Sequence, residues 1–139
     1  MSTGRILLIG FLVFLGIFII LPIIIGLISD VEFGNVARIP ITGIITAEGV
    51  SGFGQAGASS TEIVEFIKKA EENPQVKVII FEINSPGGSA VASDEIGQAI
   101  RRSTKPTLAI IREVGASGGY WVASATDYIV ANRMSITGS

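Results

Sequence analysis

The stretch VKVIIFEINSPGGS, residues 76–89, decides how the rest of this chain is organised. Its first part, residues 76–83, is a nearly continuous apolar run that is too apolar for a strand with one face in water. A second β-branched strand is predicted over residues 38–46, and a helix over residues 59–72 separates the two. Strand, helix and buried strand in this order predict a parallel βαβ unit.

The helix between these strands has recognisable ends and one apolar face. Ser59 and Glu62 form a capping box at its start, and Asn73-Pro74 ends it. The apolar positions recur at helical spacing and are expected to face the core: Ile63, Phe66, Ile67 and Ala70.

The same alternation continues toward the C-terminus. A second helix is predicted over residues 90–102, followed by strands over residues 107–111 and 128–131. We therefore expect residues 38–139 to form an α/β domain of βαβ units with a mostly parallel sheet, preceded by a linker over residues 30–37.

Two glycine-rich turns follow the apolar strands, SPGG at residues 85–88 and GASGGYW at residues 115–121. Sites in open α/β sheets form at the carboxyl ends of strands, so the two turns are expected to lie side by side. Ser117 stands between glycines before a helix that is expected to start near Val122, as a nucleophilic serine does in several hydrolases. Backbone N–H groups of both turns would then stabilise a developing oxyanion.

Composition excludes several kinds of chemistry. The 139-residue chain has no cysteine and no histidine, which removes thiolate sites, the commonest metal ligand and any Ser-His-Asp triad built from this chain alone. A formal net charge of −2 gives no electrostatic footprint for nucleic acid. Catalysis by this chain would need a base other than histidine.

A formal G-x-G-x-x-G occurs at residues 52–57, inside a loop rich in small residues. In a dinucleotide-binding fingerprint the first glycine directly follows the strand and the helix meets the pyrophosphate. Here several residues intervene after Thr46, and the helix is capped only at Ser59. The segment is therefore interpreted as a mobile loop rather than as a nucleotide site.

The combination of NSPGG, a helix, KPT, a strand, GASGGYW and ITGS resembles the signal peptide peptidase A (protease IV) family. These are membrane-bound serine peptidases related to the Clp protease and crotonase fold. The resemblance implies that Ser117 is the nucleophile and that Gly118 and Gly87 (or Gly88) supply the oxyanion amides. It also implies peptide substrates derived from membranes and a homo-oligomer, with no cofactor and no metal.

The sequence departs from the family pattern at the general base. In the family the base is a lysine that lies well beyond the serine, whereas this sequence stops at Ser139. The lysines at positions 68, 69, 77 and 105 all precede Ser117 and none matches the family's base. We therefore expect a truncated portion of a larger peptidase that is inactive by itself.

Three alternatives stay open at this point. A membrane serine peptidase of the stomatin-partner type would share the fold and a Ser/Lys dyad. An α/β-hydrolase elbow matches the literal G-x-S-x-G, but it requires a histidine and leaves the SPGG turn unexplained. A membrane-anchored scaffold subunit without activity is consistent with the missing base.

Residues 6–29 are almost wholly apolar and long enough to cross a bilayer as a helix. A secretory signal peptide is the rival interpretation, but the run is longer than a signal-peptide core and no small-x-small cleavage site follows it. Arg5 precedes the run, while Asp30 and Glu32 follow it. The positive-inside rule then places residues 1–5 in the cytoplasm and the domain outside the cell membrane.

This topology predicts that protease added to intact spheroplasts digests the domain over residues 38–139. A cytoplasmic marker protein in the same spheroplasts should survive, which controls for lysis. Protection of the domain until the membrane is broken would reverse the predicted orientation.

Overall fold

The computed structural model describes Phe14, Gly16 and residues 34–49, 51–52 and 55–138. The chain divides into two units, Met1–Phe33 and Gly34–Ser139. The expected membrane segment, residues 6–29, lies outside the described residues apart from Phe14 and Gly16. No helix among the described residues is both long enough and apolar enough to span a membrane.

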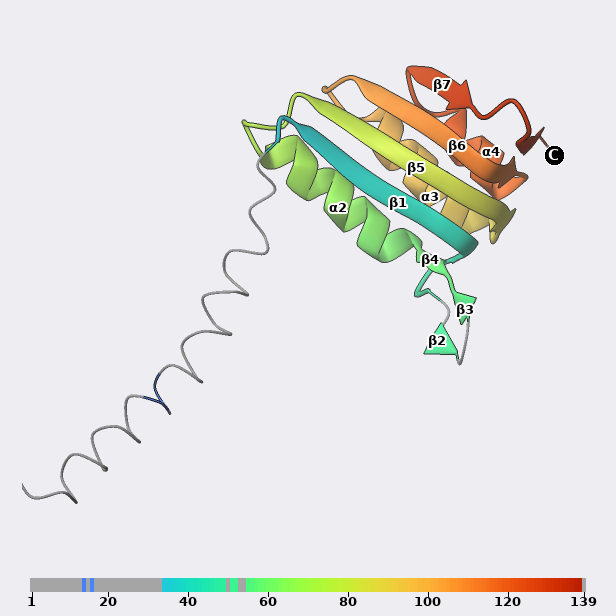
Figure 1. Ribbon diagram of the computed structural model, residues 1–139, viewed down its shortest axis with the longest axis horizontal. Coiled ribbons are helices and arrows are strands. Elements are labelled where there is room, and N and C mark those ends of the chain that lie inside the picture. Colours follow the sequence, from blue (N-terminus) through green and yellow to red (C-terminus); the bar gives the residue numbers. More distant parts are fainter. Residues whose placement is uncertain (1–13, 15, 17–33, 50, 53–54, 139) are drawn as a thin grey trace, which may run out of the picture. The chain divides into compact units, whose positions relative to one another are not determined.

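The second unit is an α/β domain built on a parallel sheet (Figure 1). In the part of the chain that the structure describes, the sheet has six strands in the order β4-β1-β5-β6-β7, with β8 also paired to β6. All of these pairings are parallel. The principal strands are β1 (Val36–Thr46), β5 (Val78–Gly88), β6 (Thr107–Ala116) and β7 (Tyr128–Ala131). The shorter strands are β2 (Ser51–Gly52), β3 (Gln55–Ala56), β4 (Ala58–Ser59) and β8 (Ile136–Gly138).

Three helices cover one face of this sheet: α2 (Ser60–Glu72), α3 (Ala90–Arg101) and α4 (Gly118–Ala123). Alternate residues of β1 and β5 point toward them and are fully buried, among them Ile41, Phe81 and Ile83. Burying each of these side chains contributes roughly 1.5–3 kcal/mol, so this layer supplies most of the hydrophobic stabilisation. The predicted βαβ architecture is confirmed.

Helix α2 begins and ends as its sequence predicts. The Ser59 side chain accepts a hydrogen bond from the Glu62 backbone N–H at 3.3 Å. At the other end, the Lys105 ammonium donates to the carbonyls of Ala70 and Asn73, both at 2.6 Å. Phe66, expected in the core, is instead 47% exposed, because the sheet covers a narrower stripe of the helix than its apolar positions span.

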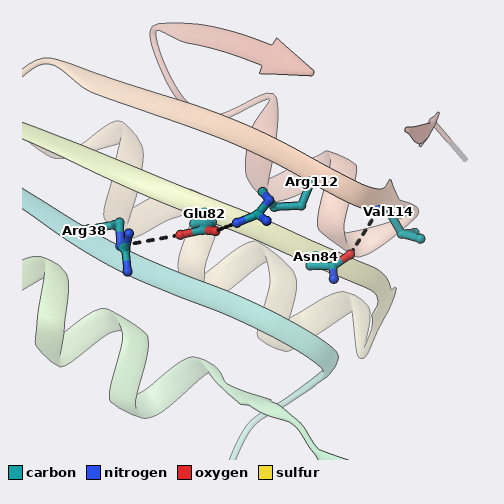
Figure 2. A network of polar contacts seen from close by, with 5 residues as sticks. All are labelled: Arg38, Glu82, Asn84, Arg112 and Val114. Carbon is teal, nitrogen blue, oxygen red and sulfur yellow. Dashed lines mark hydrogen bonds and ion pairs between the residues drawn. The ribbon is translucent and has the colours of Figure 1, made fainter. Parts of the chain in front are cut away.

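The opposite face of the sheet is partly exposed in the described residues, whereas the apolar run over residues 76–83 predicted burial on both faces. Val78, Ile80 and Glu82 on this face are half-buried. Figure 2 shows Glu82 between two arginines from the neighbouring strands, Arg38 on β1 and Arg112 on β6. The arginines neutralise a carboxylate that would otherwise lie among apolar neighbours.

The pairing of β5 with β6 becomes irregular just before the two glycine-rich turns. Ile83 pairs with Ile111, but the next paired residues are Ser85 and Gly115, so three residues of β6 oppose Asn84 alone. The Asn84 side-chain oxygen accepts a hydrogen bond from the Val114 backbone N–H at 3.1 Å (Figure 2). This side chain replaces a backbone partner that the bulge has removed.

Several element boundaries differ from the sequence predictions. Strand β5 extends through the SPGG segment to Gly88, because Ile44 and Ile45 of β1 continue to pair with Gly87 and Gly88. Helix α4 begins at Gly118 rather than near Val122. The loop that contains G-x-G-x-x-G includes an antiparallel hairpin of β2 and β3. Strand β8 was not predicted.

Glu71 connects α2 to the loop before β6, and its environment predicts a pH-dependent contribution to stability. Its pKa lies below the ordinary value of 4.5, chiefly because the Thr104 hydroxyl donates a hydrogen bond to the carboxylate. Hydrogen bonds from the Ser103 hydroxyl and the Thr104 N–H lower the pKa further. Burial acts in the opposite direction and raises it. The folded state therefore favours the ionised form. Its stabilisation is full above about pH 4.5 and is lost as the pH falls through the lowered folded pKa.

We predict that Glu71→Gln lowers the Tm by roughly 5 °C at pH 7, and that the difference from wild type disappears in acid. Glu72→Gln is the matched control, because Glu72 is exposed and only pairs with Lys68 at 3.9 Å. Thermal unfolding followed at a series of pH values measures both variants. A gap between wild type and Glu71→Gln that persists at the acid end would contradict this account.

Candidate active site

Ser117 lies at the junction of β6 and α4 in a backbone conformation that glycine normally adopts. Its φ is 50° and its ψ is −121°, and it has the only positive φ of any non-glycine residue that the structure describes. The Ser117 N–H donates to the Gly138 carbonyl at 2.6 Å, which ties the turn to β8. Its side chain makes no capping hydrogen bond to α4. The hydroxyl therefore lies on a strained turn and does not cap the N-terminus of α4.

The SPGG segment and the serine turn are in direct contact, as the carboxyl-end rule predicted. A Cβ on Gly87 would lie 2.6 Å from the Gly118 nitrogen and 2.9 Å from the Ser117 Cβ. Gly87 also has a φ of 97°. Only glycine meets both conditions, so the approach of the two backbones depends on the absence of a side chain here.

The two glycines of SPGG have different surroundings. The Gly87 N–H donates to the Ser85 hydroxyl at 3.0 Å. The Ser89 N–H donates to the Ile45 carbonyl, so β1 bonds to the residue after Gly88, and Gly88 itself directs its N–H away from β1. Of the two, Gly88 lines the cavity beside Ser117. These contacts favour Gly88 over Gly87 as the amide available to a ligand.

A cavity of about 690 Å³ opens beside Ser117. Its wall is mainly apolar, and two half-exposed aromatic rings form part of it, Tyr120 and Trp121. The Trp121 ring is held from two sides, by a hydrogen bond from its Nε1 to Asp94 at 3.3 Å and by the Arg101 guanidinium 5.3 Å from the ring centre. The lining residues are Gly88, Ala90, Ser93, Asp94, Ser117, Gly118, Tyr120, Trp121, Ser124 and Gly138.

The four lysines of the chain all have other interactions and none lines this cavity. Lys68 and Lys69 form ion pairs along α2 with Glu72 and Glu65. The Lys77 ammonium donates to the Pro74 carbonyl, and that of Lys105 donates at the end of α2. Among the described residues, no group of three or more side chains could hold a metal ion.

Sequence reasoning missed three polar residues that shape this site. Ser93 and Asp94 line the cavity from α3, and Ser85 lies buried beneath the turn. Ser85 stands within the NSPGG motif, so the motif itself was the available signal. Nothing in the spacing of Ser93 and Asp94 indicated that their helix faces the serine turn.

The chain is similar to known peptidases in sequence. Residues 99–139 match the model of peptidase family S49. Protease 4 of Haemophilus influenzae is 40% identical over 88 residues, which cover 61% of this chain and 14% of that protein. A putative signal peptide peptidase SppA of Enterococcus faecium is 30% identical over 109 residues, covering 76% of this chain and 32% of that protein. The chain thus spans less than a third of the length of either relative.

Solved structures share the fold. A mutant of the 1510-N membrane-bound stomatin-specific protease, in complex with a substrate peptide, aligns with a TM-score of 0.62 and 24% identity over 78% of this chain and 46% of that chain. An enoyl-CoA hydratase/isomerase family member aligns with a TM-score of 0.59 and 22% identity over 75% and 46% of the two chains. The domain therefore has the Clp protease and crotonase-like fold.

The strained conformation of Ser117 predicts a difference between two substitutions that both remove the hydroxyl. Ser117→Gly should be more stable than Ser117→Ala by about 1 kcal/mol, because glycine adopts the positive φ without a clash, although its unfolded chain is more flexible. Denaturant unfolding of the two variants measures this difference directly. An alanine variant as stable as the glycine variant would show that the turn is unstrained.

Proposed function

Because the chain belongs to peptidase family S49, the family of signal peptide peptidase A (protease IV), we propose that Ser117 is the nucleophile of a membrane-anchored serine endopeptidase. The observation that carries this proposal is the contact between the Gly87 backbone and the Ser117–Gly118 backbone. That contact brings the only strained serine of the described residues next to backbone amides from a second loop.

The reaction follows from this arrangement. The Ser117 oxygen attacks the carbonyl carbon of a peptide bond, and its proton passes to a base. The carbonyl oxygen becomes an oxyanion, which accepts hydrogen bonds from the N–H groups of Gly118 and Gly88. Collapse of the tetrahedral intermediate breaks the C–N bond and releases the amine with a proton from the base. Water then hydrolyses the acyl-serine by the same steps.

The base in this proposal is a lysine supplied from beyond Ser139. The chain has no histidine, and its four lysines have their ammonium groups in other interactions. A lysine base must be held neutral beside the serine. None of these four lysines lines the cavity beside Ser117. Backbone amides stabilise the oxyanion but do not remove the serine proton, so they do not replace a base.

Peptides are the proposed substrates, in line with the substrate peptide bound to the stomatin-specific protease of similar fold. The cavity beside Ser117 has room for a side chain next to the scissile bond, and its aromatic wall favours an apolar one. Together with an anchor over residues 6–29 and a domain outside the cytoplasm, this favours remnants of signal peptides and other membrane-derived peptides. We also propose that the complete protein assembles as a homo-oligomer.

The structural similarity also supports a second candidate, a membrane peptidase of the stomatin-partner type. It uses the same nucleophile and differs in its substrate. Cleavage of signal peptides, compared with cleavage of peptides from a stomatin homologue, separates the two. A scaffold without activity is the outcome if neither class is cleaved.

We predict that the 139-residue form is inactive and that a form extended to the length of its relatives cleaves peptides. In the extended form, Ser117→Ala should reduce turnover by at least about 10⁴-fold, leaving only the residual rate that the oxyanion hole and substrate binding support. Peptide cleavage by purified short and extended forms, with and without the substitution, is the measurement. Activity that survives Ser117→Ala would assign the nucleophile elsewhere, and Ser117-dependent activity of the short form would place the base within this chain.

A further inference from the structure

Ser85 is a fully buried serine directly beneath the two site turns. It does not line the cavity beside Ser117, so it does not touch a substrate there. We propose that Ser85 is a positioning residue: its hydroxyl holds the SPGG segment so that the Gly88 amide is placed in the oxyanion hole. This inference rests on the proposed peptidase function and adds a residue to its machinery.

The Ser85 hydroxyl joins two backbone groups that the sheet leaves without ladder partners. It donates to the Gly43 carbonyl at 2.6 Å and accepts from the Gly87 N–H at 3.0 Å. Between Thr42 and Ile44 the register of β1 against β5 shifts, and both bonded glycines lie at this irregularity. A hydroxyl suits the position because one small group both donates and accepts.

Ser85 also fixes the other half of the site. A Cβ on Gly119 would lie 2.7 Å from the Ser85 carbonyl oxygen and 3.3 Å from its Cβ, so the first turn of α4 packs directly on Ser85. The same residue thus contacts the segment that carries Gly88 and the helix that follows Ser117. A single buried residue therefore contacts the backbone on both sides of the candidate oxyanion hole, through its hydroxyl on the SPGG side and through its carbonyl and Cβ on the α4 side.

Removal of the hydroxyl would change this spacing in a defined way. In Ser85→Ala, the Gly43 carbonyl and the Gly87 N–H lose their partner inside the protein, where an unpaired polar group is costly. We expect the Pro86–Gly87 peptide unit to rotate so that these two groups find other partners. This rotation would also move the N–H of Gly88, which follows directly in the chain. Oxyanion donors act over about 3 Å, and a displacement of about 1 Å can reduce the rate by roughly 100-fold.

Steady-state kinetics of the extended enzyme test this role. Ser85→Ala should reduce kcat by about 10- to 100-fold with KM changed less than about threefold, and should weaken binding of a peptide aldehyde, whose adduct carries the oxyanion, by the same factor as kcat. The matched control is Ser60→Ala, which removes a fully buried hydroxyl that donates to Glu95 at 2.6 Å between α2 and α3, where neither residue lines the cavity. It should lower the Tm but not kcat.

Hydrogen exchange of the wild-type amides gives a readout that needs neither activity nor a folded variant. The Gly87 N–H should exchange at least about tenfold more slowly than the Gly88 N–H, because only the former is bonded to Ser85. Equal protection of the two amides, or a Ser85→Ala enzyme with wild-type kcat, would overturn the positioning role. If instead the wild-type enzyme shows no turnover that depends on Ser117, the proposed peptidase function is wrong. The exchange rates of the two amides would then still test whether the Ser85 hydroxyl holds the Gly87 N–H.

Discussion

The half of this domain that carries the candidate site depends on the contact between the Gly87 backbone and the Gly118 nitrogen. A Cβ added to Gly87 would lie only 2.6 Å from that nitrogen, so no side chain fits at this position. The contact requires that β5 and β6 are neighbours, that both strands deviate from regular pairing just before the site, and that the chain turns sharply at Ser117. Each of these features is present, and hydrogen bonds stabilise the backbone at each irregularity and at the turn.

Two side chains of the NSPGG motif stabilise these deviations from either side of β5. Asn84 points to the partly exposed face and accepts from the Val114 N–H on β6, whereas Ser85 points into the protein and bonds to Gly43 on β1 and to Gly87. Neighbouring residues of a strand face opposite sides, so one dipeptide supports both irregularities. The motif therefore has a structural role that is separate from its proposed role in catalysis.

The sequence predicted the principal strands, the helices between them and the meeting of the two turns, because apolar periodicity and the carboxyl-end rule depend on local pattern and topology. It did not predict the extension of β5 to Gly88, because glycine has low strand propensity and the pairing partner lies in β1. The choice between Gly87 and Gly88 as a donor depends on strand register, which no local pattern contains. The exposure of Phe66 likewise depends on how widely the sheet covers α2.

The order of the strands has a consequence for how fast the domain assembles. From β1 through β5 and β6 to β7, each principal strand pairs with the next one along the chain after a single helical crossover. Contacts between consecutive units close shorter loops than contacts between distant segments, and a lower contact order speeds folding. The two glycine turns are carried on β5 and β6, so they meet when these strands pair. We therefore expect the contact between the two turns to form as the centre of the sheet forms, before β8 adds its hydrogen bond to Ser117.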